Sequence, residues 1–385
     1  MQGKQKDMLA RTPRITKVRA ASINHRLASP IHYGNWVMTH REFVLVRLDA
    51  ESGDAGFAYC LSREGPVAEI IRKTIAPVYV GSNIDAPEEI FYRALWSNHA
   101  THAAGVGMRA LSVVDIAAWD LSAKVAGESI SHHLGGINRP PLPATAIVGY
   151  PPDIDGQATA RQVEELWDRG WRRFKVPIAP TIDLSIERLE AVRSVAPDAW
   201  VGFDLNMVLR SAAEVLALER RVRHLRLGWI EDVVPPGDAS MVAAIRAGSD
   251  TPIAIGDDQG GSYYPEALLQ AGSVDVLRID ATTNGGVTRL RQIIRDASEH
   301  GVRVAPHMFP HIHSRLMAAF GVEAPIEWGI PGTGVHPMDD ALEQPVVRDG
   351  LMQPLADAPG FGDLVRRSWI DEQFVNDPDG ALDEL

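Results

Sequence analysis

The sequence predicts an α/β protein in which a TIM-like (β/α)7β barrel follows an amino-terminal α+β domain. Three observations lead to this fold class. Eight short apolar runs alternate with amphipathic helical segments between residues 144 and 328. Before them, strand-like and helical segments are grouped instead of alternating. The last seven runs each carry an ionisable residue at or next to their end, as expected where the strands of a barrel carry catalytic groups at one rim.

Composition excludes several classes of protein. The 385 residues are 45% hydrophobic and 23% charged, which is typical of a globular chain. Fifty acidic against 38 basic residues give a net charge of -12, which argues against a nucleic-acid partner. The single cysteine, Cys60, excludes an intrachain disulfide and a cysteine zinc site. Because no apolar run has the length of a membrane span or a signal peptide, we expect a cytoplasmic protein with no membrane partner.

The amino-terminal part is expected to comprise a loose polar leader and an α+β domain. Residues 1–14 lack periodicity and form the leader, and the domain extends over residues 15–140. The segments ITKVRAASI, REFVLVRLDA and FAYC predict an antiparallel meander. Apolar positions at helical spacing then predict a helical block, and LGGINRPPLP closes the domain.

Residues 141–355 are expected to form the barrel. Its predicted strands are ATAIVG, RRFKV, WVGFD, LGWIE, PIAIGD, VDVLRID, VRVAPH and APIEW. An open doubly wound sheet is the alternative, but neither a G-x-G-x-x-G nor a P-loop motif supports it. Residues 356–385 are expected to pack back on the amino-terminal domain.

Ionisable residues end seven successive predicted strands. They are Lys175, Asp204, Glu231, Asp257, Asp280, His307 and Glu327. Neighbours in this series are 20 to 29 residues apart, one βα unit each, so a barrel brings all seven to one rim.

Asp204, Glu231 and Asp257 follow three consecutive strands and predict a magnesium site. Three converging carboxylates repel one another unless a hard cation neutralises them, and ligation by oxygen alone favours Mg²⁺. Taken singly, each acid is as readily explained as a helix cap or a solvated loop residue. The regular spacing favours the metal site.

Asp280 and His307 end the next two strands and predict a general base. A carboxylate that holds one imidazole nitrogen leaves the other nitrogen facing the site. Capping of the helix after Asp280 is the alternative for that residue, and we interpret His311 and His313 as structural.

Three further residues are expected to contact the substrate. Lys175 faces the metal across the rim, where a cation binds or polarises a carboxylate; a surface lysine is the alternative. Asn206 lies on the same side of the chain as Asp204 and within reach of a substrate hydroxyl or the metal shell. Glu327, if protonated, donates a hydrogen bond to a developing enolate oxygen.

These segments together resemble the enolase superfamily and, within it, the mandelate racemase subgroup. The segment ALSVVDIAAWDLSAKVAGESISHHLGG resembles the end of that family's capping domain, and FDLN, WIEDVVPP, PIAIGD, RIDATTNGGVTRL, VAPH and IEWG resemble its strand ends. The resemblance implies one Mg²⁺ per subunit on Asp204, Glu231 and Asp257. It also implies an Asp280–His307 acid/base dyad, with Glu327 assisting the enolate oxygen.

The chain departs from the family pattern at three places. Lys175 is followed by Val176 and Pro177, so the second lysine of the usual K-x-K is missing and a two-base racemase is disfavoured. The third ligand is commonly Glu, whereas here Asp257 is followed by Asp258, and either acid is a candidate. Asp232 replaces the second Glu of E-E-P, a change that we expect not to affect ligation.

The K-x-P sequence is similar to that of rhamnonate dehydratases and predicts a sugar acid as substrate. We therefore expect a Mg²⁺-dependent acid sugar dehydratase that removes the C2 proton, eliminates the 3-hydroxyl and yields a 2-keto-3-deoxy acid. The resemblance implies that capping loops supply specificity, which makes His32, Tyr33, Trp36 and Arg63 candidates for substrate binding.

Two alternatives remain beside the dehydratase. One is an epimerase, racemase or lactone cycloisomerase acting on similar sugar acids. The other is a barrel that binds sugar acids without turnover, which the intact Asp280–His307 pair disfavours because a binder needs no base. The resemblance is compatible with a homo-oligomer, although no segment has the signature of an interface.

Overall fold

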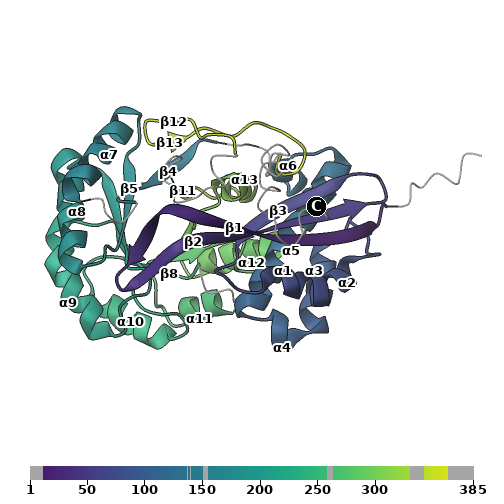
Figure 1. Ribbon diagram of the computed structural model, residues 1–385, viewed down its shortest axis with the longest axis horizontal. Coiled ribbons are helices and arrows are strands. Elements are labelled where there is room, and N and C mark those ends of the chain that lie inside the picture. The colour runs from purple at the N-terminus through teal and green to yellow at the C-terminus, as the bar shows by residue number, and fades with distance from the viewer. Residues whose placement is uncertain are drawn as a thin grey trace, which may run out of the picture.

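Two parts of the chain make up the described structure, an amino-terminal α+β domain and a barrel (Figure 1). The computed structural model describes residues 12–136, 138, 140–150, 155–257, 263–329 and 342–362. The expected leader lies outside these residues as far as position 11, and the expected carboxyl-terminal segment lies outside them from position 363.

The amino-terminal domain begins with the predicted antiparallel meander. Its strands, in the sheet order β1-β2-β3, are β1 (Ile15–Tyr33), β2 (Trp36–Ala50) and β3 (Ala55–Leu61). The first hairpin is longer than the sequence indicated, because β1 continues through His32 to a Tyr33–Trp36 pair at a tight turn. Gly34 in this turn has φ = 56°, a conformation that glycine adopts without strain. The hairpin extends from the domain across the barrel (Figure 1).

Helical segments follow this sheet in the amino-terminal domain. They are α1 (Val67–Ile70), a π-helical turn (Ile71–Ile75), α2 (Ala76–Tyr79), α3 (Pro87–Ser97), α4 (His99–His102), α5 (Gly105–Ala126) and α6 (Ile130–His133). The central helix α5 is buried over most of its length and lies against β3. Gly56 of β3 permits this close packing, since a Cβ there would stand 2.2 Å from the Ala117 carbonyl oxygen.

Eight parallel strands form the barrel, as predicted. They are β4 (Leu142–Ile147), β5 (Arg173–Pro177), β6 (Trp200–Asp204), β7 (Trp229–Glu231), β8 (Ile253–Ile255), β9 (Val276–Ile279), β10 (Arg303–Pro306) and β11 (Ile326–Gly329). The strands β4 to β10 pair in chain order, and β11 returns to pair with β4. A short hairpin, β12 (Val347–Arg348) and β13 (Leu351–Met352), adds antiparallel to β4.

Helices join consecutive barrel strands throughout the described chain. They are α7 (Gly156–Asp168), α8 (Ile182–Val195), α9 (Ala212–Val222) with the 3-10 turn Arg223–Leu225, α10 (Ala239–Gly248), α11 (Tyr264–Gln270), α12 (Gly286–Glu299) and α13 (Pro310–Phe320). Side-chain caps at Asp155, Thr181, Ser211 and Asp238 begin four of them. The (β/α)7β prediction is therefore confirmed.

The two domains join where α5 meets the beginning of α12. Asp115 of α5 accepts hydrogen bonds from the Thr288 backbone N–H (3.0 Å) and from Thr288 Oγ1 (2.8 Å). Ser112 Oγ accepts a bond from the Gly285 N–H at 2.8 Å. Residues of the amino-terminal domain thus satisfy free N–H groups of a barrel helix, which fixes one domain on the other. At the far end of α5, Asp120 accepts a hydrogen bond from the Phe361 N–H at 2.7 Å.

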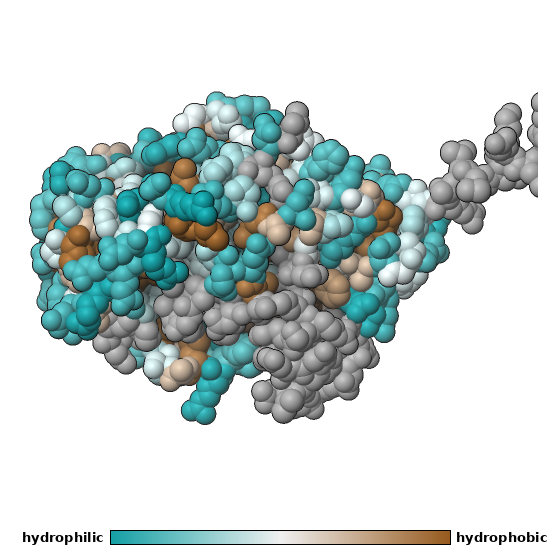
Figure 2. Space-filling model, turned by 90° about the horizontal axis from the view of Figure 1, so that it is seen from above, coloured by the Kyte–Doolittle hydropathy of each residue, from teal (hydrophilic) through white to brown (hydrophobic). Residues whose placement is uncertain are grey.

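The described surface is mainly polar. Hydrophilic residues predominate in the view of Figure 2, and hydrophobic ones form separate patches. None of the helices in the described residues combines the length and the apolar composition needed to cross a bilayer.

Candidate active site

The barrel brings the seven predicted ionisable residues to one end. Asp204 and Glu231 are the last residues of β6 and β7 and pair directly across the two strands. Lys175 lies in β5 and Glu327 in β11, whereas Asp257, Asp280 and His307 follow β8, β9 and β10. Six of them are at most 7% exposed, and the His307 side chain is 13% exposed. Almost all of this charge is therefore buried, and each group needs a partner.

A group of three carboxylates forms the acidic centre of the site. Oxygens of Asp204, Glu231 and Asp232 lie within 4.8 Å of one another, a spacing suited to a shared metal ion. Asp232, which we expected not to affect ligation, is thus a further candidate for the third ligand beside Asp257. It follows Glu231 directly and has φ = 49°, so the extended path of the strand ends there. Asp258, the alternative third ligand, lies outside the described residues.

Two buried cations hold Asp204 and Glu231 of this group, together with Glu327. Lys175 Nζ lies 2.9 Å from Glu231 Oε1, 3.1 Å from Asp204 Oδ2 and 2.8 Å from Glu327 Oε2. Arg278 of β9 contacts Glu231 Oε1 at 3.1 Å and Glu327 Oε2 at 2.6 Å. Burial lowers the pKa of Lys175, but the carboxylates outweigh burial and raise that pKa well above its ordinary value. Lys175 is thus a charged residue of the site, and the surface-lysine alternative is wrong.

The acids at the centre respond differently to burial. Burial raises the pKa of Asp204 to about 6, against the lowering effect of Lys175. Burial also acts on Glu231, but Arg278 and Lys175 prevail and lower its pKa below the ordinary value. Glu231 therefore stays ionised to a lower pH than Asp204.

Trp229 fixes the second oxygen of Glu231. Its indole Nε1 donates to Glu231 Oε2 at 3.0 Å, so both carboxylate oxygens of Glu231 are held. Sequence reasoning missed Trp229 and Arg278. Each stands two residues before a predicted site acid, on the same side of its strand, and that period of two was the available signal.

His307 and Asp280 are in contact, as predicted. His307 Nδ1 lies 3.1 Å from Asp280 Oδ2 and 3.2 Å from Asp257 Oδ2. Because both neighbours are carboxylate oxygens, Nδ1 carries the proton in this geometry, and Nε2 is left as the basic nitrogen. The Thr282 N–H donates to Asp280 Oδ1 at 2.7 Å and orients the carboxylate.

The two nearby histidines are structural, as interpreted from the sequence. His313 Nε2 accepts a hydrogen bond from the Ala281 N–H at 2.9 Å, while its Nδ1 lies 2.7 Å from the Met308 carbonyl oxygen. Burial lowers the pKa of His313 to about 4 and that of His311 to about 3, so both rings are neutral.

A cavity of about 350 Å³ lies between the two domains above these groups. The barrel contributes Asp204, Asn206, Met207, Asp232, Asp257 and His307, and the amino-terminal domain contributes Trp36, Ser62, Arg63, Gly105, Val106 and Arg109. This volume suits a small-molecule substrate. Asn206 Nδ2 is buried and has no hydrogen-bond partner among the described residues, which leaves a donor for a ligand.

The predicted substrate-binding residues of the amino-terminal domain divide into two groups. Trp36 and Arg63 line the 350 Å³ cavity. Tyr33 is buried beneath Trp36, and its hydroxyl accepts a hydrogen bond from Tyr150 at 2.8 Å. His32 is half-buried on β1 and does not line that cavity. His32, Tyr33 and Trp36 lie in strands and not in a capping loop, because β1 and β2 pair as far as the tip of the first hairpin.

Only one carboxylate oxygen of Glu327 has partners among the described residues. Its Oε2 receives both Lys175 and Arg278, whereas its buried Oε1 has no hydrogen-bond partner among the described residues. The expected donation to an enolate oxygen therefore depends on Oε1.

Comparison with known families and proteins gives a consistent assignment. Residues 15–135 match the amino-terminal domain of the mandelate racemase / muconate lactonizing enzyme family, and residues 158–368 match the enolase carboxyl-terminal domain-like family. The D-galactarolactone cycloisomerase of Agrobacterium fabrum is 28% identical over 385 residues, covering 95% of this chain and 100% of the relative.

Dehydratases are similar over most of the chain as well. The L-talarate/galactarate dehydratase of Salmonella typhimurium is 26% identical over 332 residues, covering 84% of this chain and 81% of the relative. The crystal structure of an L-talarate dehydratase from a Polaromonas species, complexed with Mg and L-glucarate, superposes with a TM-score of 0.79 at 25% identity. It covers 91% of this chain and 94% of that one.

Proposed function

The chain belongs to the mandelate racemase / muconate lactonizing enzyme family of the enolase superfamily, and from this premise we propose that it is a Mg²⁺-dependent acid sugar dehydratase. The names of similar proteins support this class, since they include an L-talarate/galactarate dehydratase and an L-rhamnonate dehydratase. The substrate is a sugar acid with a hydroxyl group on C2 and on C3.

The observation that carries the proposal is the placement of a base and an acidic metal-binding group in one cavity. His307, held at 3.1 Å by Asp280, lines the same cavity as Asp204 and Asp232. Proton removal next to a carboxylate needs a base on one side and a positive charge on the carboxylate.

The donor set fits Mg²⁺. All the candidate ligands are carboxylate oxygens, they are buried, and burial raises the pKa of Asp204 to about 6, which a bound dication would reverse. Asp204, Glu231 and Asp257 would hold the ion, with Asp232 as the competing third ligand. The ion, when bound, supplies positive charge that stabilises the substrate carboxylate as C2 loses its proton.

His307 performs both proton transfers in the proposed reaction. Its Nε2 takes the C2 proton, and the C2–H electron pair moves toward the carboxylate. The protonated ring then gives that proton to the departing 3-hydroxyl, so the C3–O bond breaks and water leaves. The resulting enol tautomerises to a 2-keto-3-deoxy acid. Lys175 adds positive charge beside the substrate carboxylate, and Asn206 Nδ2 donates to a substrate hydroxyl.

One base is sufficient for this syn elimination. Pro177 stands at the position of the second lysine of the family's K-x-K, and the lysine that remains, Lys175, contacts Glu231, Asp204 and Glu327. A two-base racemase therefore lacks its second base, whereas a dehydratase does not need one.

Cycloisomerisation of a sugar acid lactone is the second candidate, because the similar A. fabrum enzyme aligns over its full length. It uses the same proton abstraction, but the product retains the mass of the substrate. The mass of the product therefore separates the two candidates.

The test is a mass-spectrometric screen of mono- and diacid sugars and their lactones with the Mg²⁺-loaded protein in D₂O. Loss of one water from one substrate is the expected result. Deuterium uptake at C2 of an acid that keeps all its hydroxyl groups would favour epimerisation, and conversion of a lactone to a keto acid without loss of water would favour the cycloisomerase. No change in any compound would contradict the proposed activity and favour a non-catalytic sugar-acid-binding protein.

A further inference from the structure

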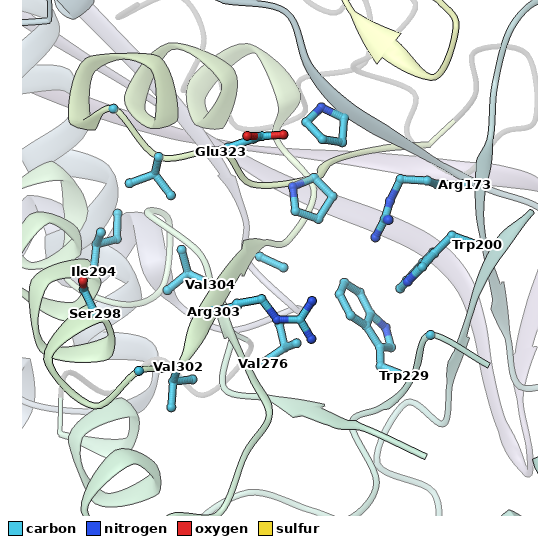
Figure 3. A pocket seen from close by; sticks show the side chains of 17 residues that line it. Arg173, Trp200, Trp229, Val276, Ile294, Ser298, Val302, Arg303, Val304 and Glu323 are labelled. Carbon is cyan, nitrogen blue, oxygen red and sulfur yellow. The ribbon is translucent and has the colours of Figure 1, made fainter. Parts of the chain in front are cut away.

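A second cavity lies at the opposite, amino-terminal end of the barrel strands. It has a volume of about 570 Å³, and Arg173, Trp200, Trp229 and Arg303, from the beginnings of β5, β6, β7 and β10, contribute to its lining. Figure 3 shows the two arginine side chains entering it from opposite sides, with both indole rings beside them. It shares no lining residue with the cavity that contains His307.

The two arginines form a concentration of positive charge. The Arg173 guanidinium stacks on Trp200, with Cζ 3.8 Å from the ring centroid, and its Nε donates to Thr145 Oγ1 at 3.2 Å. Neither Arg173 nor Arg303 forms an ion pair with a carboxylate in the part of the chain that the structure describes, although Glu323 lies on the same lining. Burial, followed by the nearby charge of Arg303, lowers the pKa of Arg173 to about 10. The opposite charge of a bound anion would raise this pKa again.

Much of the remaining lining is apolar. Trp200 and Trp229 meet edge to face, with centroids 4.5 Å apart and an interplanar angle of 77°. Val276, Ile294, Val302 and Val304 surround them. Guanidinium groups bind carboxylate and phosphate in a bidentate manner, and indole faces accept planar apolar groups.

We propose that this cavity binds a small organic anion, with its carboxylate or phosphate between Arg173 and Arg303 and its apolar part against Trp200 and Trp229. The volume lies within the range of small-molecule sites, and the few convergent polar groups on an apolar lining are typical of them.

This site is connected to the acidic centre through one side chain. The Trp229 ring lines the second cavity, and its Nε1 donates to Glu231 Oε2 at 3.0 Å. A ligand packed against the ring alters the position of that donor and so changes the affinity of the acidic centre for a divalent cation. This step rests on the proposed role of Glu231, whereas anion binding itself does not.

Isothermal titration calorimetry with phenyl phosphate and with benzoate, in EDTA and without substrate, tests the anion site. Inorganic phosphate tests the need for the apolar part, and benzylamine presents a ring with the opposite charge. Saturable binding of phenyl phosphate or benzoate, tighter than that of phosphate and with none of benzylamine, is expected. In Arg303→Gln and Arg173→Met the affinity should fall about tenfold or more.

Two matched variants locate the binding. Arg220→Gln changes an exposed arginine of α9 and should leave the dissociation constant unchanged, and so should Arg63→Gln in the active-site cavity. The proposal would be overturned if Arg303→Gln left the dissociation constant of the anion unchanged, or if Arg63→Gln lowered the affinity for the anion as much as Arg303→Gln does. The circular-dichroism spectrum of each variant checks that it folds.

A titration with Mg²⁺, with and without saturating phenyl phosphate, tests the connection. A change of about fivefold in the Mg²⁺ dissociation constant is expected, and it should disappear in Trp229→Phe, which keeps a ring but lacks the donor. An unchanged constant in the wild-type protein would overturn the connection between the sites. Because neither titration includes a sugar acid, their failure is distinct from failure of the dehydratase proposal.

Discussion

The two ends of the barrel are built from the same strands but differ in charge. β5 carries Arg173 at its beginning and Lys175 near its end, β6 begins with Trp200 and ends with Asp204, and β7 runs from Trp229 to Glu231. At the carboxyl end, buried carboxylates surround Lys175 and Arg278. At the amino end, two arginines face one cavity without a carboxylate partner among the described residues.

This difference indicates what each end binds. The carboxyl end has an excess of negative charge that a cation completes, and it also has a base. The described lining of the amino end carries two arginines and aromatic surface, which suit the binding of an organic anion. The short strands place the two ends close enough for Trp229 to touch both.

Replacement of Glu231 should have the largest effect. Glu231→Gln removes the acid whose pKa burial raises but Arg278 and Lys175 lower, and with it a proposed metal ligand of the centre. We expect turnover to fall by about 10⁴-fold, because charge stabilisation of several kcal/mol is lost. Calorimetric titration with Mg²⁺ and kinetics of the substrate check this. Tight Mg²⁺ binding by the variant would contradict the assignment of Glu231.

The third ligand can be identified by a matched pair of substitutions. Asp257→Asn should weaken Mg²⁺ binding by about 100-fold, and Asp232→Asn should weaken it less. Both changes preserve size and remove one charge, so their difference reports ligation. If Asp232→Asn weakens Mg²⁺ binding more than Asp257→Asn does, the third ligand is Asp232, whose oxygen lies within 4.8 Å of those of Asp204 and Glu231.

Trp229→Phe tests the role of the side chain that lies at both ends of the barrel. The variant loses the 3.0 Å hydrogen bond to Glu231 Oε2 but keeps an aromatic ring. Loss of such a bond to a metal ligand typically costs 10- to 100-fold, and we expect a reduction of about tenfold in Mg²⁺ affinity and in kcat/KM. Trp167→Phe, a tryptophan of α7 outside both cavities, is the control. Equal effects of the two substitutions would mean that the hydrogen bond has no specific role.

The pH dependence of metal binding gives the smallest expected change. Burial raises the pKa of Asp204 to about 6, and only its ionised form binds Mg²⁺. Affinity should therefore fall about tenfold for each pH unit below 6 and become constant above about pH 7. Titrations between pH 5 and 8 check this, and a flat profile below pH 6 would contradict a role for Asp204 as ligand.

Sequence reasoning predicted the parts of this molecule that follow a regular period. The barrel strands and the residues that end them were predictable because apolar runs recur with the βα unit. Trp229 and Arg278 were missed because only the ionisable residue at the end of each run was a candidate. Side chains two positions before that residue point to the same interior of the barrel. The residues of the second cavity also recur with the βα unit, but they begin the strands, and barrels of this kind carry their catalytic groups at the opposite end.

Other features depend on packing that a single sequence does not display. The length of β1, and with it the strand position of His32 and Tyr33, follows from pairing with β2 as far as Trp36. The entry of Asp232 into the acidic centre follows from its backbone conformation after β7, where φ is 49°.

The most direct test of the account is C2–H cleavage by His307→Asn. The assay uses the sugar acid identified in the screen and is run in D₂O. Total C2–H cleavage is the amount of deuterium found in the recovered substrate plus the amount of product formed. The account predicts that it falls to background while the Mg²⁺ affinity stays close to that of the wild type, and that the exposed His300→Asn retains full activity. Undiminished cleavage in His307→Asn would contradict the assignment of the base and favour Lys175 in that role.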